Sequence, residues 1–228
     1  MGSGRVLYRP PMRTFIAAVL AAVVSAMLPA GAQTNAPKIV PNPDAFKVLC
    51  AGDSITQRGY PEVLQGLLGP GYAVANAGHS GVTALKHAGT RSYPNAGPKT
   101  RADIVVIMLG TNDAKVETWT KFKDQFVKDY TELVESFRKL SPQPKVFVAL
   151  PPQIFRRDTG TGFSAANLEE AVALTRQVAA ASGCLLIDVH AALAHQPEKF
   201  GDGVHPNDAG KAVIAKAVSD AIAATKSK

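Results

Sequence analysis

The chain has little of what marks metal-binding or disulfide-rich proteins. Only two of its 228 residues are cysteines, Cys50 and Cys184. Each stands in or beside a short apolar run typical of a strand, so buried free thiols are favoured over a bridge. Neither cysteine has metal-ligand spacing to another Cys or to a His. The sequence therefore gives no indication of a metal site.

Clustered positive charge is also missing. Lys and Arg outnumber Asp and Glu by 25 to 18, which gives a formal net charge of +7. These basic residues are scattered, with no run of five or six and no aromatic residues interleaved among them. Proteins that bind nucleic acids concentrate basic residues on one face or in one run. We therefore expect a solvated basic surface and no nucleic-acid partner.

No hydrophobic run is long enough to span a bilayer, which takes about 20 residues. The most apolar stretch, Phe15 to Leu28, has 14 residues; three arginines precede it, and a small-x-small pattern ends at Ala32. This pattern is typical of a secretory signal peptide cleaved after Ala32, with a membrane helix as the alternative. We expect residues 1–32 to be a signal peptide, the protein to be exported, and no stable membrane insertion after cleavage.

The rest of the chain shows no internal repeat and no shift in composition. Its proline-rich stretch at 33–44 is predicted to be a linker. With 46% hydrophobic and 19% charged residues, the chain has an ordinary globular composition. Its length suits one domain, which we expect at residues 45–228.

Short apolar segments alternate with longer segments of helical periodicity. The predicted strands are 46–51, 72–77, 103–109, 145–150 and 184–189. The third is apolar on both faces, as a central parallel strand is. Apolar stripes at helical spacing occur at 122–137, 168–178 and 214–222. This alternation predicts an α/β fold in which helices cover both faces of a five-stranded parallel sheet.

Polar residues follow the predicted strands at the edge where such sheets bind ligands, beyond the carboxyl ends. Ser54 follows the first strand, Gly78 the second and Asn112 the third. The loop beyond the fifth strand leads to Asp202 and His205. The fold is thus expected to bring four distant segments to one edge.

These residue types suit nucleophilic catalysis. A serine hydroxyl needs a base to take its proton, and the imidazole of His205 suits that task near neutral pH. Asp202 is placed to hold the other ring nitrogen of His205 and to stabilise the imidazolium. The backbone N–H groups of Ser54 and Gly78 and the side-chain amide of Asn112 are candidate donors to the oxyanion.

Each residue taken alone also has a structural interpretation. Asp53 and Ser54 are common helix caps, and Asp-Gly and Pro-Asn are turn sequences. Asp113 is expected to secure its loop, and His190 to be structural. His79 is left open as a substrate contact. Gln153, Phe155 and Arg156 either line the site or form an exposed loop. The convergence of four segments favours catalysis.

Three motifs carry a resemblance to a known family. Gly-Asp-Ser-Ile-Thr (52–56), Gly-Thr-Asn-Asp (110–113) and Asp-Gly-Val-His-Pro-Asn (202–207) resemble those of the SGNH, or GDSL-like, hydrolase superfamily. Its four named residues match Ser54, Gly78, Asn112 and His205 in order, and Asp202 matches the triad acid. Like that family, the chain lacks a Gly-x-Ser-x-Gly elbow around its serine.

The resemblance implies a flavodoxin-like three-layer α/β/α sandwich and ester hydrolysis through an acyl-serine intermediate, with no metal or organic cofactor. Within the superfamily the motifs look most like bacterial carbohydrate and sialate-type O-acetylesterases. The expected substrate is a small-molecule or glycan ester, with acetyl as the expected acyl group. Two alternatives remain open: a lysophospholipase or thioesterase with the same machinery, and a non-catalytic glycan-binding module.

Overall fold

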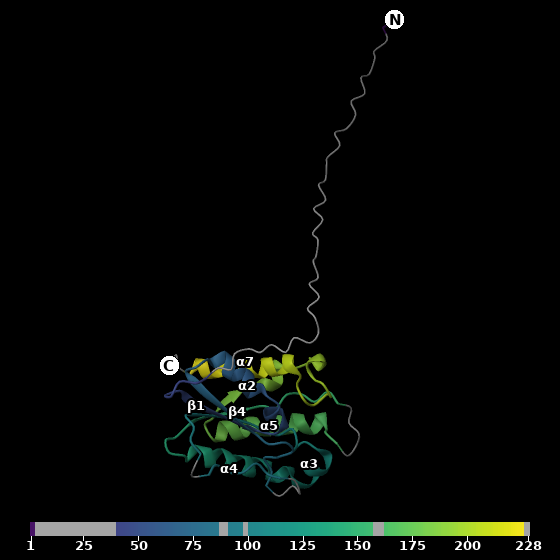
Figure 1. The fold of residues 1–228 in the computed structure, drawn as a ribbon. Helices are drawn as coiled ribbons and strands as arrows, with labels where there is room; N and C mark the ends of the chain where they lie inside the picture. The colour runs from purple at the N-terminus through teal and green to yellow at the C-terminus, as the bar shows by residue number, and fades with distance from the viewer. Residues whose placement is uncertain (3–39, 87–90, 98–99, 157–161, 226–228) are drawn as a thin grey trace. The chain divides into compact units, whose positions relative to one another are not determined.

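A computed structural model describes residues 1–2, 40–86, 91–97, 100–156 and 162–225 (Figure 1). The expected signal peptide lies outside these residues except for its first two positions, and so does most of the expected linker. Within the described ranges, no helix combines the length and the hydrophobicity that crossing a membrane requires.

Five parallel strands form a single sheet, as the alternation of segments predicts. The strand order is β2-β1-β3-β4-β5. The strands are β1 (Phe46–Gly52), β2 (Tyr72–Gly78), β3 (Ile104–Met108), β4 (Lys145–Ala149) and β5 (Leu185–Ile187). The central position of β3 agrees with its hydrophobicity on both faces.

Strand β5 is shorter than the predicted segment 184–189. The carboxylate of Asp188 accepts a hydrogen bond from the Ala191 N–H at 2.8 Å and so caps a short helix, α6 (Val189–Ala192). Val189 is buried, but as the first residue of that helix. The apolar run therefore continues past the end of the strand at Ile187 because Val189 packs in the core as a helix residue.

Helices cover both faces of the sheet (Figure 1). Helices α2 and α7 lie together on one side, and α3, α4 and α5 lie on the other. The bounds are α1 (Ser54–Gln57), α2 (Tyr60–Leu68), α3 (Val116–Phe122), α4 (Phe126–Arg138), α5 (Ala165–Ala181) and α7 (Asp208–Ala224), with 3-10 turns η1 (Lys123–Gln125) and η2 (Pro197–Lys199). The predicted stripe at 122–137 begins in α3 and continues through η1 into α4.

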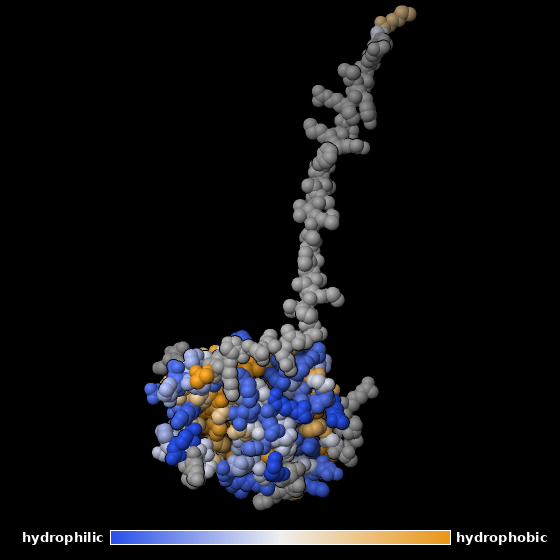
Figure 2. Space-filling view, in the orientation of Figure 1, coloured by the Kyte–Doolittle hydropathy of each residue, from blue (hydrophilic) through white to orange (hydrophobic). Residues whose placement is uncertain are grey.

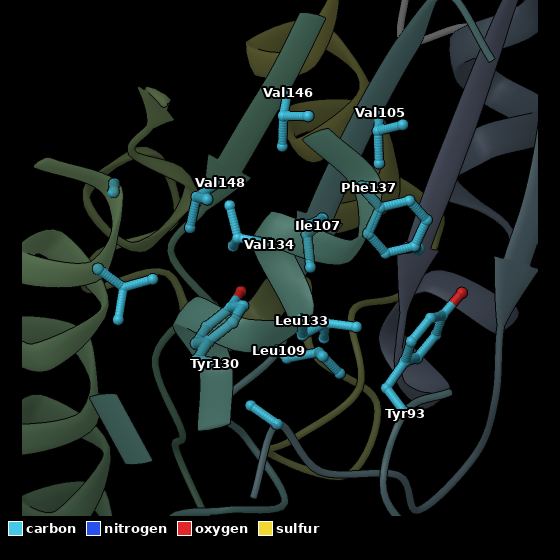
Figure 3. Close-up of a cluster of buried hydrophobic side chains, with 14 of the residues drawn as sticks. Tyr93, Val105, Ile107, Leu109, Tyr130, Leu133, Val134, Phe137, Val146 and Val148 are labelled. Carbon is cyan, nitrogen blue, oxygen red and sulfur yellow. The ribbon is translucent and has the colours of Figure 1, made fainter. Parts of the chain in front are cut away.

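Alternate residues of β3 point into two separate cores. Val105 and Ile107 pack against α4 and α5, whereas Val106 and Met108 pack against α2 and α7. All four are at most 1% exposed. Figure 3 shows the first core, in which the strand residues face aromatic and aliphatic side chains of α4 such as Phe137. The result is a three-layer α/β/α sandwich.

The face drawn in Figure 2 is mostly hydrophilic, with smaller hydrophobic areas between. The large hydrophobic side chains that the described residues expose are Met1, Val40, Phe46, Leu67, Leu185 and Leu186. Most other large hydrophobic residues that the structure describes are buried in the cores.

Candidate active site

The carboxyl ends of three neighbouring strands bring the first site segments together. Gly52 at the end of β1 lies opposite Gly78 of β2 on one side and Met108 of β3 on the other. The residues that follow these three positions therefore leave the sheet next to one another. Ser54 and Asn112 both lie in these segments.

Ser54 begins helix α1 directly after a tight strand-to-helix turn. A Cβ on Gly52 would lie 2.2 Å from Thr56 Oγ1 and 2.7 Å from the Met108 carbonyl oxygen, so the turn closes only around glycine. Asp53 caps α1 by accepting a hydrogen bond from the Ile55 N–H at 2.8 Å. The turn holds Ser54 at the sheet edge with a side chain that is nearly buried.

A chain of hydrogen bonds joins Ser54, His205 and Asp202. Ser54 Oγ lies 2.9 Å from His205 Nε2, and His205 Nδ1 lies 2.7 Å from Asp202 Oδ2. The tautomer that fits has Nδ1–H donating to the carboxylate and Nε2 accepting the serine proton. This arrangement can activate a hydroxyl as a nucleophile.

The carboxylate of Asp202 is held in its ionised form. Its Oδ1 accepts the backbone N–H groups of Val204 at 3.0 Å and His205 at 2.7 Å. Partial burial acts to raise the pKa of Asp202, but the hydrogen bonds from the side chain and backbone of His205 and from Val204 outweigh it and lower the pKa well below its usual range. A fixed negative charge therefore lies beside the imidazole.

The loop that carries Asp202 and His205 rests on the segment after β4. Gly203 has a φ of +79°, and a Cβ there would lie 2.8 Å from the Arg156 nitrogen. The Phe155 N–H donates to the Gly203 carbonyl at 2.7 Å, and the Phe155 and Phe200 rings lie 4.9 Å apart. Phe155 thus buttresses the histidine loop, a role that residue spacing alone does not reveal.

Asn112 presents an amide at the same edge. One N–H of its Nδ2 donates to the Val82 carbonyl at 3.0 Å, and the side chain is 4% exposed. This bond fixes the amide and leaves its second N–H for another acceptor. Asn112 therefore has the geometry of a preorganised donor.

Gly78 lies at this edge, but its N–H is already engaged. It donates to Asn76 Oδ1 at 3.0 Å. A Cβ at this position would lie 2.2 Å from the Gln57 nitrogen, so the glycine permits β2 to pass close to α1. The structure thus gives Gly78 a packing role and does not show a free donor there.

A second glycine at this edge fits the donor role better than Gly78. Gly81 has a φ of +78° and an open space where a Cβ would stand. Among the described residues, nothing accepts its N–H, and the next residue, Val82, is the one to which Asn112 bonds. The available signal was the second glycine of Asn-Ala-Gly-His-Ser-Gly at 76–81.

Two further carboxyls lie buried beneath the site. Asp113 accepts hydrogen bonds from the N–H groups of Ala84 and Leu85 at 3.2 and 2.9 Å, so it secures its loop as predicted. Burial raises the pKa of Asp113 to about 6. Burial, with a smaller contribution from the Asp113 charge, raises the pKa of Asp53 to about 7.

The other histidines and the cysteines have clear surroundings. His190 lies 2.9 Å from the Pro151 carbonyl oxygen and 3.1 Å from Glu169, in agreement with a structural role. His79 is exposed, and its ring lies 5.6 Å from that of Tyr93. Both cysteines are free. Within the part of the chain that the structure describes, no group of three or more His, Cys, Asp or Glu is arranged to hold a metal.

Comparison with known proteins assigns the family. The pattern of the GDSL-like lipase/acylhydrolase family matches residues 50–213, a stretch that contains Ser54, Asn112 and His205. The chain belongs to this family. The GDSL-like match covers most of the chain, from the end of β1 into α7.

Individual relatives of this GDSL-like chain are esterases by name. It is 31% identical over 214 residues to an acetylxylan esterase of Xylanibacter ruminicola, and the match covers 80% of this chain and 44% of that protein. The chain thus spans less than half the length of this relative. A carbohydrate acetylesterase family member from Sinorhizobium meliloti has a similar structure, with a TM-score of 0.65, 23% identity and coverage of 78% of this chain and 97% of that one. The aryl esterase of M. smegmatis gives a TM-score of 0.62, 20% identity and coverage of 79% and 99%. These structures support the fold.

Proposed function

We propose that the protein is an exported serine esterase that removes small acyl groups, chiefly acetyl, from carbohydrates. The observation that carries this proposal is the unbroken chain of hydrogen bonds from Ser54 through His205 to Asp202. The acetylxylan esterase named among the relatives supports an acetylated carbohydrate as the substrate.

The geometry supports a two-step mechanism. Ser54 Oγ attacks the ester carbonyl while His205 Nε2 takes the hydroxyl proton, and Asp202 stabilises the resulting imidazolium. The tetrahedral intermediate then breaks its bond to the alcohol oxygen, which receives the proton from His205. A water molecule deacylates the serine by the same route and releases the acid and the free hydroxyl.

Donors near the attacked carbonyl stabilise the oxyanion. We assign this role to the Ser54 backbone N–H and to the second N–H of Asn112. Of the two glycines, Gly81 is the better third donor, because the Gly78 N–H is held by the Asn76 side chain. Gly78 contributes by allowing the close approach of β2 and α1.

Removal of the nucleophile tests the proposal directly. Ser54→Ala is expected to bring hydrolysis of p-nitrophenyl acetate down to about the level that binding and oxyanion donors alone sustain, a loss of roughly 10⁴-fold or more. Ser219→Ala on α7 is the matched control and is expected to keep full activity. A fluorophosphonate probe is expected to label the parent protein and not Ser54→Ala. Unchanged turnover by folded Ser54→Ala would refute the mechanism, and failure of the parent to react would favour the non-catalytic glycan-binding module.

Two further measurements address substrate and export. In a series of acyl chain lengths, acetyl is expected to give the highest kcat/KM, whereas a preference for eight carbons or more would favour the lysophospholipase or thioesterase alternative. Mass spectrometry of the mature protein is expected to find Gln33 at its N-terminus. A cytoplasmic, uncleaved product would contradict the signal-peptide assignment.

A further inference from the structure

A small pocket borders the catalytic histidine. Its volume is about 240 Å³. Its lining residues are Arg58, Gly201, Asp202, His205, Pro206, Asn207 and Lys211. We call it the Arg58 pocket.

Most charges around this pocket already have partners. Asp202 accepts three N–H bonds from the loop that contains it. Lys211 forms an ion pair with Asp208 at 2.8 Å, on the exposed side of α7. The Arg58 side chain is exposed, and it has no hydrogen bond or ion pair with any residue that the structure describes. Its guanidinium is therefore a charged group at the pocket that is available to bind an anionic ligand.

The backbone fixes the position from which the Arg58 side chain extends. Arg58 is the C-cap of α1, and its N–H donates to the Ser54 carbonyl at 3.0 Å. Gly59, with a φ of +115°, then turns the chain into α2. Ser54 thus begins the one-turn helix α1, and Arg58 caps its other end, four residues after the nucleophile.

The chemistry of the triad tells which part of the ester reaches this pocket. His205 delivers a proton to the leaving alcohol oxygen, so the alcohol part of the substrate must lie on the imidazole side. His205 lines the Arg58 pocket. Ser54 and Asn112 do not line it, so we assign the pocket to the alcohol part and not to the acyl group that Ser54 holds.

We propose that the Arg58 pocket binds a carboxylate on the alcohol part of the substrate, which makes O-acetylated acidic sugars such as hexuronates the favoured class. Arg58 is the specificity-determining residue, because a guanidinium forms two parallel hydrogen bonds with a planar carboxylate. This assignment rests on the proposed esterase function.

A pair of substrates that differ at one carbon tests the assignment. The acetylated methyl glycosides of glucuronic acid and glucose differ only in a carboxylate against a hydroxymethyl group. The parent enzyme is expected to favour the acid, and Arg58→Gln is expected to lower the acid-to-neutral ratio of kcat/KM by about 10- to 100-fold. Arg58→Lys is expected to give an intermediate ratio, since the charge stays and the planar fork is lost.

Matched controls separate the pocket from general surface charge. Arg176→Gln removes an exposed arginine that pairs with Asp188, and Lys216→Gln removes a lysine of α7 that pairs with Asp220. Neither lines the pocket, and each is expected to keep the parental ratio. Added salt is expected to lower the ratio in the parent protein more than in Arg58→Gln.

The results distinguish this inference from the proposed function. If the parent enzyme hydrolyses p-nitrophenyl acetate but shows no preference for the acid, or if Arg58→Gln keeps the parental ratio, the inference is overturned and the esterase function stands. If the parent hydrolyses no ester at all, the proposed function fails and the pocket assignment fails with it.

Discussion

The carboxyls on two sides of Ser54 differ in their exposure and in the direction of their pKa shifts. Asp202 lies on the exposed side, with a side chain that is 48% exposed and bonded to His205. Asp53 and Asp113 lie beneath the serine and are at most 1% exposed. The pKa of Asp202 is lowered, whereas burial raises the pKa of Asp53 to about 7 and that of Asp113 to about 6.

The surroundings of each carboxyl determine whether its ionised or its neutral form is favoured. Asp202 has three N–H donors, so its ionised form is favoured and it can stabilise an imidazolium. Asp53 has lost its hydration and lies near a second carboxyl, so its neutral form is favoured at mildly acidic pH. We therefore assign the exposed acid to catalysis and the buried acids to the shape of the loops that hold Ser54 and Asn112.

The same substitution on the two sides is expected to have very different effects on turnover, and the larger effect concerns Asp202. Asp202→Asn is expected to lower kcat by about 10⁴-fold, because the amide disfavours the required tautomer and cannot stabilise the imidazolium. Asp220→Asn, which removes another exposed carboxylate with an ion-pair partner, is the control and is expected to keep full activity. A loss of less than tenfold in steady-state turnover of p-nitrophenyl acetate by Asp202→Asn would show that the exposed acid is not part of the triad.

A substitution at Asn112 tests whether this residue belongs with the catalytic or with the structural residues. It stands between Thr111 and Asp113 in the buried loop, yet we assign its amide to the oxyanion. Asn112→Ala is expected to lower kcat by about 10²–10³-fold with little change in KM. The midpoint of urea unfolding, measured in parallel, reports the separate cost of leaving the Val82 carbonyl without its donor. A stability loss with normal kcat would place Asn112 with the structural residues.

The smallest effect on turnover is expected for Asp53→Asn. The amide oxygen can still accept the Ile55 N–H, so the cap survives and kcat is expected to fall by less than about tenfold. The pH dependence of stability is expected to change instead. Because the folded pKa is raised, the contribution of Asp53 is fully present below its unfolded pKa near 3.8 and is lost as pH rises through about 7.

Urea unfolding between pH 4 and 7.5 measures this contribution. The unfolding free energy of the parent protein is expected to decline with rising pH by at most about 1.4 kcal/mol per pH unit for this one group. Asp53→Asn is expected to show a shallower decline, with the remaining slope below pH 6 due to Asp113. Identical slopes for parent and variant would mean that Asp53 titrates as in the unfolded chain.

The sequence predicts the sheet well because strand signals are local. From Ile104 to Leu109 the predicted third strand is apolar on both faces, which is typical of a covered central strand, and β3 occupies that position. The predicted end of the fifth strand was wrong, because hydrophobicity at Val189 does not distinguish a strand from the first turn of a buried helix. The capping bond of Asp188 decides it.

The sequence predicts the residues of the proposed triad, but it does not predict which N–H groups are free to bind the oxyanion. Ser54 and His205 are recognisable because their chemistry is specific and parallel strands place them at one edge, and the structure brings them within 2.9 Å. The choice between Gly78 and Gly81 depends on which N–H already has an acceptor, here the side chain of Asn76. That information is tertiary, and so is the support that Phe155 gives to Gly203.

The bond between Ser54 and His205 spans 151 positions of the chain. The hydroxyl belongs to the first helix after β1, and the imidazole lies just before α7, which packs beside α2 on the outer layer (Figure 1). No fragment that lacks either end of this stretch can assemble the pair, and a ribosome must deliver nearly all of the domain before proton transfer becomes possible. Turnover of a chromogenic ester during refolding would therefore report when the two ends of this stretch have come together.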